Sequence, residues 1–115
     1  TPAIEMAISL IRAGAEINYY DPEANKNYQR AMATKDIEQS KLHSFDNMYD
    51  CLNGRDGLVL LTEWPEFRAP DFNEIKTRLK TGNLFDARNI YAANKVIETG
   101  LNYFSIGKQN KREQQ

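Results

Sequence analysis

The sequence contains a single cysteine, Cys51, and a single histidine, His43. One cysteine cannot form an internal disulfide, so the chain is not a disulfide-stabilised secreted domain and suits a reducing compartment such as the cytoplasm. A zinc site would need carboxylate ligands almost exclusively, and we therefore expect no metal site. Neither residue has a partner at the spacing of a catalytic pair, so we expect both to be structural.

Long apolar runs and an excess of one charge are also missing. The longest clean apolar run, residues 58–61, is far shorter than the roughly 20 residues of a membrane-spanning helix, so we expect no membrane association. The formal net charge of −1 gives no electrostatic basis for binding nucleic acid. A length of 115 residues is sufficient for one domain with one core.

Helical and strand patterns alternate along the chain. Apolar residues recur at helical spacing in residues 1–11, where Thr1 would cap a helix that Gly14 ends. Further helices are expected at residues 24–32, 46–52, 71–79 and 92–99, and short strands at residues 15–20, 42–45, 57–61, 83–86 and 101–106. We expect a domain of residues 1–107, followed by a disordered polar tail, residues 108–115.

This alternation predicts an α/β fold, namely a three-layer, Rossmann-like parallel sheet with helices on both faces. The continuous apolar run at residues 57–61 is typical of a strand that is covered on both faces. Folds of this kind normally open with a strand, whereas this sequence opens with a helix. We therefore expect the first strand to lie upstream of Thr1, the alternative being a domain that begins with a helix.

Ligands of open parallel sheets bind beyond the carboxyl ends of the strands. Four places in the sequence meet this rule: Asp21, Thr62-Glu63-Trp64, Asp86-Ala87-Arg88-Asn89 and Gly107. Arg88 is the strongest candidate, because its permanently charged, planar guanidinium matches a phosphate or a carboxylate. The alternatives for Arg88 are a salt bridge to Asp86 or Glu63, or a solvated side chain without a partner.

The other candidate residues each have a structural interpretation beside the functional one. Glu63 could act as a general base or pair with Arg88, and Trp64 could stack on a base or sugar or simply pack against a helix. Asp21 stands where dinucleotide-binding folds place a ribose-binding acid, but Asp-Pro also starts turns. The sequence has no G-x-G-x-x-G motif, so we expect no cofactor to bind to this chain.

Six segments carry a family resemblance when they are taken in order. They are Thr1-Pro2-Ala3-Ile4, Tyr20-Asp21-Pro22, Leu58 to Phe67 with Thr62-Glu63-Trp64 at its centre, Asp71-Phe72, Phe85-Asp86-Ala87-Arg88-Asn89 and Tyr103-Phe104-Ser105-Ile106-Gly107. Together they resemble the C-terminal, UDP-binding domain of the UDP-glucose/GDP-mannose dehydrogenase family. The Glu63-Trp64-x-x-Phe67 segment is similar to the UDP-glucose dehydrogenase branch.

The resemblance implies a part in the NAD-dependent oxidation of UDP-glucose to UDP-glucuronate. It also implies that an N-terminal domain binds NAD and that a middle region supplies the nucleophilic cysteine and the contacts of a homodimer or larger oligomer. Cys51 does not lie in the family's G-G-S-C-F-like motif, so that role does not pass to it. This chain would bind the UDP part of the substrate and be inactive alone. The alternative is a stand-alone α/β binding or interaction module without catalytic activity.

The resemblance further implies a role for one residue. Arg88 matches the arginine of the family's F-D-G-R-N-like motif, which is expected to contact the substrate, while Thr62, Glu63 and Trp64 would line the cleft. Ala87 stands where the family motif has glycine. If that position requires a positive φ, the loop is strained or shaped differently here.

Overall fold

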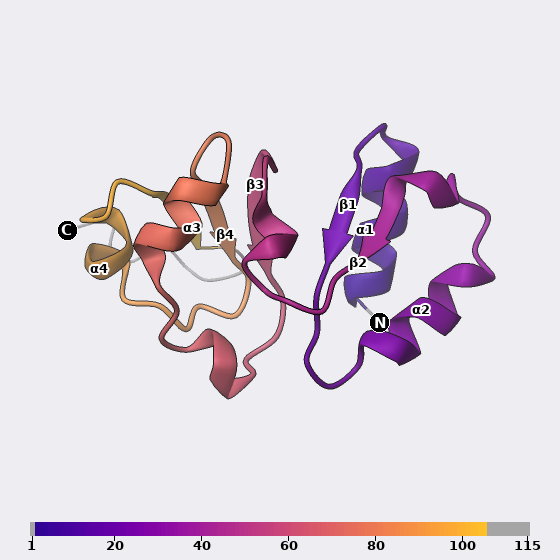
Figure 1. Ribbon diagram of the computed structural model, residues 1–115, viewed down its shortest axis with the longest axis horizontal. Coiled ribbons are helices and arrows are strands. Elements are labelled where there is room, and N and C mark those ends of the chain that lie inside the picture. Colours follow the sequence, from indigo (N-terminus) through magenta and orange to yellow (C-terminus); the bar gives the residue numbers. More distant parts are fainter. Residues whose placement is uncertain (1, 106–115) are drawn as a thin grey trace. The chain divides into compact units, whose positions relative to one another are not determined.

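The computed structural model describes residues 2–105 and shows parallel strands flanked by helices (Figure 1). This confirms the predicted α/β class. Thr1, Gly107 and the tail predicted at residues 108–115 lie outside the described residues. The chain divides into two compact units, Thr1–Cys51 and Leu52–Gln115, and each unit has its own sheet.

The first unit contains a two-stranded parallel sheet. Its elements are α1 (Pro2–Arg12), β1 (Ile17–Tyr19), α2 (Asn25–Ala33) and β2 (Leu42–Ser44). β1 pairs with β2, with Ile17 opposite Leu42, and α1 lies alongside them (Figure 1). Gly14, at φ 102°, follows the end of α1 as predicted, because glycine adopts this left-handed conformation without steric cost.

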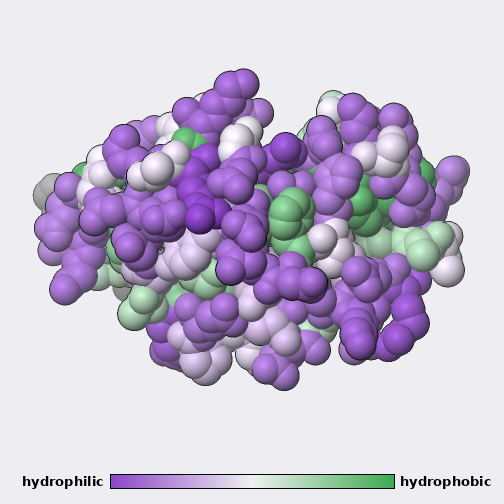
Figure 2. Space-filling model, viewed as in Figure 1, coloured by the Kyte–Doolittle hydropathy of each residue, from purple (hydrophilic) through white to green (hydrophobic). Residues whose placement is uncertain are grey.

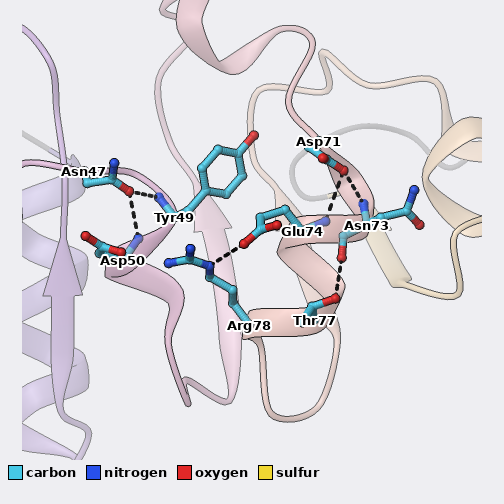
Figure 3. A network of polar contacts seen from close by, with 8 residues as sticks. All are labelled: Asn47, Tyr49, Asp50, Asp71, Asn73, Glu74, Thr77 and Arg78. Carbon is cyan, nitrogen blue, oxygen red and sulfur yellow. Dashed lines mark hydrogen bonds and ion pairs between the residues drawn. The ribbon is translucent and has the colours of Figure 1, made fainter.

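The predicted helix at residues 46–52 is wrong. The structure has only a short 3₁₀ turn, Asp50–Leu52, in this region. Asn47 caps this turn, because its side-chain oxygen accepts hydrogen bonds at 2.9 Å from the backbone N–H groups of both Tyr49 and Asp50 (Figure 3). Such local side-chain bonds offer the backbone an alternative to a regular helix.

The second unit contains a three-stranded parallel sheet. Its elements are β3 (Gly57–Leu60), α3 (Phe72–Arg78), β4 (Asn83–Asp86), α4 (Ala93–Ile97) and β5 (Asn102–Ser105). The strand order is β3-β4-β5. The register places Leu60 opposite Asp86 and Asp86 opposite Ser105, so the carboxyl ends of all three strands meet at one edge.

Helix α3 begins where the sequence predicts. The Asp71 carboxylate accepts hydrogen bonds from the backbone N–H groups of Asn73 and Glu74, at 3.0 and 3.1 Å (Figure 3). The Glu74 side chain accepts a 2.7 Å bond from Arg78 Nε, one turn along the helix. Asp71 therefore satisfies two of the amides that a helix start leaves unpaired.

One face of the three-stranded sheet forms the core of this unit. Leu84 and Asp86 are fully buried on it, and the helix residues Ile75 and Val96 are also buried. Because β3, β4 and β5 advance in one direction across the sheet, right-handed crossovers place α3 and α4 on the same face.

The opposite face of that sheet is more open. Val59 and Phe104 are 36% and 46% exposed, and Phe104 stacks on Phe85 at a centroid distance of 4.8 Å. The apolar run at residues 57–61 forms the predicted strand, β3, and Val59 is its partly exposed apolar residue.

The surface in view is largely hydrophilic, with apolar side chains in scattered patches (Figure 2). None of the helices in residues 2–105 combines the length and the hydrophobicity that crossing a bilayer requires.

Candidate functional site

The loops that follow β3 and β4 bring two of the predicted site residues together. These strands are parallel neighbours, so the segment after Leu60 and the segment after Asp86 leave the same edge of the sheet. The Arg88 guanidinium lies against the Glu63 carboxylate, with Nη2 at 2.5 Å and Nε at 2.9 Å from Oε2. The predicted alternative of an ion pair with Glu63 is thus confirmed.

This ion pair leaves part of Arg88 accessible. The side chains of Arg88 and Glu63 are 48% and 40% exposed. Glu63 engages Nε and Nη2, and within residues 2–105 the Nη1 group of Arg88 has no hydrogen-bond or ion-pair partner. An arginine has five N–H donors in a fixed plane, so a second planar or tetrahedral anion can bind at the edge formed by Nη1 and Nη2.

The loop that carries Arg88 is built on the carboxylate of Asp86. Asp86 is fully buried at the end of β4. Its Oδ1 accepts hydrogen bonds from the backbone N–H groups of Arg88, at 3.0 Å, and Asn89, at 2.7 Å. The sequence predicted Asp86 as part of a candidate ligand-binding segment and as an ion-pair partner of Arg88. An aspartate immediately before a polar loop is the signal that could have indicated this cap.

The backbone of the loop does not require a positive φ at Ala87. Among residues 2–105, Asn89 at φ 58° has the only positive φ outside glycine. Ala87 therefore adopts an ordinary conformation, and its N–H donates to the Leu60 carbonyl at 3.0 Å, which extends the pairing of β3 and β4. Asparagine tolerates the left-handed region better than most residues, so the turn needs no glycine at position 87.

Thr62 and Trp64 flank Glu63 in the segment after β3. Both are partly buried. The carbonyl of Trp64 accepts a 2.8 Å hydrogen bond from the N–H of Phe67, at the start of the short 3₁₀ turn Pro65–Phe67. Trp64 thus begins a turn, while Thr62 remains a candidate for lining the site.

Asp21 has a structural role in the first unit. It is buried, and its Oδ1 accepts hydrogen bonds from the N–H groups of Glu23 and Ala24, at 2.9 and 2.8 Å. Its own N–H donates to the Asn25 side chain. This geometry agrees with the turn that Asp-Pro predicts at residues 21–22.

The lone histidine and cysteine lie in different environments. His43 Nε2 lies 2.6 Å from Glu16 Oε2, so His43 has a partner that sequence spacing missed. Both side chains are more than 40% exposed, and the pair lies at the surface. Cys51 is buried. Within residues 2–105, no three histidine, cysteine or acidic side chains are grouped to bind a metal ion.

Comparison with known proteins identifies relatives over nearly the whole chain. Residues 1–93 match the model of the UDP-glucose/GDP-mannose dehydrogenase family, UDP binding domain. The UDP-glucose 6-dehydrogenase of Rhizobium meliloti (strain 1021) is 38% identical over 94% of this chain, and that of Pseudomonas aeruginosa is 36% identical over 93%. UDP-glucose 6-dehydrogenase 4 of Oryza sativa subsp. japonica is 32% identical over 94% of this chain.

These matches cover only part of each relative. The chain spans 23% of the bacterial proteins and 26% of the rice protein. The similarity therefore concerns one region of these longer relatives, and the matched residues 1–93 span both Glu63 and Arg88.

Proposed function

Since the chain belongs to the UDP-glucose/GDP-mannose dehydrogenase family, we propose that it binds the UDP part of a nucleotide-sugar substrate. The substrate would be UDP-glucose, as the names of the relatives reported above indicate. We further propose that Arg88 contacts this substrate, with Thr62, Glu63 and Trp64 lining the cleft.

The observation that supports this proposal is the geometry of the Arg88 guanidinium. It stands at the carboxyl ends of parallel strands, it is half-exposed, and Glu63 holds it by one edge only. Charge-assisted hydrogen bonds from arginine to phosphate or carboxylate oxygens are among the strongest polar contacts in proteins. The free edge of Arg88 can therefore bind an anionic group while Glu63 keeps the side chain oriented.

In the longer enzyme, the reaction would be the NAD-dependent oxidation of UDP-glucose to UDP-glucuronate. Binding the UDP end would hold the sugar in place for the chemistry, since contacts remote from the reacting centre supply orientation. Within the described residues, the segment that follows β1 does not fit NAD. The turn after β1 has no glycine, and the Asp21 carboxylate there bonds to backbone amides.

We assign the remaining functions to other regions of the enzyme. An N-terminal domain would bind NAD, and a middle region would supply the nucleophilic thiol and the contacts of a homodimer or larger oligomer. Cys51 is buried, and a reactive thiol must be accessible to its substrate. A cytoplasmic location is consistent with the use of NAD and a soluble nucleotide sugar.

Titration of the purified chain with UDP tests the binding proposal. We expect saturable binding by calorimetry, and Arg88→Ala should weaken it about tenfold to a hundredfold, because a hydrogen bond to a charged group contributes roughly 1.5–3 kcal/mol. Arg68→Ala removes the same charge from another exposed arginine and should leave the affinity unchanged. Equal affinities of the wild type and Arg88→Ala would refute the assignment of Arg88.

The natural reading frame upstream of Thr1 tests the wider proposal. We expect it to encode a strand–turn–helix with a G-x-G-x-x-G motif and, further on, a motif containing the catalytic cysteine. A natural protein without these would instead be the stand-alone binding module. Assays of the full-length enzyme with several nucleotide sugars would then identify its substrate.

A further inference from the structure

The buried carboxylate of Asp86 is the acceptor of five hydrogen bonds, four of them from the loop that carries Arg88. Asp86 is fully buried, and each of the groups that bond to its carboxylate is a hydrogen-bond donor. Oδ1 accepts from the N–H groups of Arg88 and Asn89, and Oδ2 accepts from the N–H groups of Ile90 and Tyr91, at 3.0 and 3.1 Å, and from the Tyr103 hydroxyl, at 2.8 Å. A carboxylate is an acceptor only, so all five donors match its chemistry.

These bonds fix the backbone from Arg88 to Tyr91. The Arg88 N–H itself bonds to Asp86, and the next three amides bond to the same carboxylate. The end of the loop is held a second time, because the Tyr91 hydroxyl donates to the Phe67 carbonyl at 2.6 Å and the Tyr91 ring packs edge-on against Phe72. The Arg88 backbone therefore has little freedom to move, although its side chain is half-exposed.

We propose that Asp86 is a positioning residue for Arg88, which fixes the direction of the guanidinium toward the UDP-sugar. This inference rests on the proposed function, since it assigns the substrate contact to Arg88. Asp86 is buried and does not touch the substrate. It acts by holding the loop in one conformation. In that conformation one edge of the Arg88 guanidinium contacts Glu63 and the other edge can contact a ligand.

The substitution Asp86→Asn tests this with the smallest change of shape. An asparagine side chain has one acceptor oxygen and an NH₂ group. That NH₂ group would face the donors now bound to one carboxylate oxygen, so the loop must open or rearrange. We expect the affinity for UDP to fall about tenfold, since small displacements of a positioning contact have effects of that order or larger.

Tyr103→Phe is a milder second variant in case Asp86→Asn fails to fold. It removes one of the five donors and leaves the four backbone amides in place. We expect a smaller loss of UDP affinity than for Asp86→Asn. Asp71→Ala is the matched control, because it also removes a carboxylate that accepts two backbone amides but lies at the start of α3. It should lower the melting temperature without changing the affinity for UDP.

The decisive measurement combines UDP calorimetry with the NMR signal of the Arg88 Nε–H group. In the wild type, the bond to Glu63 should slow exchange of this proton with water. Faster exchange together with weaker UDP binding in Asp86→Asn or Tyr103→Phe supports the positioning role. Folded variants with wild-type exchange and affinity would overturn it.

The same measurements separate this inference from the proposed function. If the wild type and Arg88→Ala bind UDP equally, the proposed substrate contact is wrong. The Arg88 Nε–H exchange in the Asp86 and Tyr103 variants still decides whether Asp86 positions that side chain. If Arg88→Ala weakens binding while folded Asp86→Asn does not, only the positioning role is refuted.

Discussion

Arg88 and Glu63, which are 25 residues apart in the sequence, form an ion pair with Nη2 and Oε2 separated by 2.5 Å. The pairing of β3 with β4 brings their loops together, because parallel neighbours end at the same edge of the sheet. The pair is partly exposed on both sides. Its main effect is therefore on the orientation of Arg88 and not on the free energy of unfolding.

Glu63→Gln tests this weak contribution to stability. Exposed ion pairs contribute about 0.2–1 kcal/mol, so we expect the free energy of unfolding to fall by no more than about 1 kcal/mol at low salt. At about 1 M salt the loss should largely disappear, because the screening length is then roughly 3 Å. Urea unfolding at both salt concentrations measures the difference. Glu23→Gln, at another exposed glutamate, is the control; a loss of several kcal/mol for Glu63→Gln would show that the pair braces the fold.

Arg88→Lys in the full-length enzyme tests whether the shape of the guanidinium matters. Lysine keeps the charge but cannot make a planar, two-pronged contact. We expect Arg88→Ala to lower kcat/KM about tenfold to a hundredfold and Arg88→Lys to recover only part of that loss. The affinity for NAD should change little. Steady-state kinetics and thermal melts of the same variants are compared, and normal kinetics with a lower melting temperature would mean that Arg88 only supports the loop.

Most elements of the fold could be predicted because each carries a local signal. The apolar spacing in residues 1–11, the apolar run at 57–61 and the helix predicted at 71–79 all correspond to observed elements within the described residues. The failure at residues 46–52 has a local cause. Asn47 bonds to two backbone amides, and a side chain that competes with the helix in this way is invisible to hydrophobic periodicity.

The site was less predictable, because its geometry depends on tertiary contacts. Arg88 and Glu63 could be named from their positions after strands, and the register of β3 with β4 explains why they meet. The role of Asp86 was harder to predict. An aspartate before a polar loop can bond to backbone amides, as Asp86 does, or pair with a nearby arginine, and the local sequence does not decide between the two. The positive φ at Asn89 depends on how the whole loop closes.

We expect the purified 115-residue chain to show no reduction of NAD with UDP-glucose. The sequence has no glycine-rich pyrophosphate-binding loop, and its one thiol, Cys51, is buried. Absorbance at the wavelength of NADH measures the reaction, and the full-length enzyme is the positive control. Turnover that persists after removal of contaminating dehydrogenases would contradict the assignment of catalysis to other regions.

The strand edges of the two sheets predict association of the isolated chain. β1 pairs with β2 alone, and β3 pairs with β4 alone, among the strands in residues 2–105. A free edge presents unpaired N–H and C=O groups that template pairing with another strand. We expect light scattering to show that the isolated chain associates as its concentration rises. A longer chain that includes a natural strand-forming segment before Thr1 should associate less. A chain that stays monomeric at high concentration would show that these edges need no further strand.

Tyr19 predicts a pH dependence of stability in the alkaline range. Burial raises the pKa of its phenol above the usual 10.0, and the hydrogen bond with Ser44 opposes this to a smaller extent. The folded state therefore favours the neutral phenol. Its contribution to stability is complete below about pH 10 and is lost as the pH rises through the raised pKa of the folded state. Tyr19→Phe cannot ionise, so its free energy of unfolding should fall less steeply than that of the wild type above pH 10. Urea unfolding at pH 8 and at several values above 10 measures both slopes; parallel curves for the two proteins would mean that the Tyr19 phenol ionises equally in the folded and unfolded states.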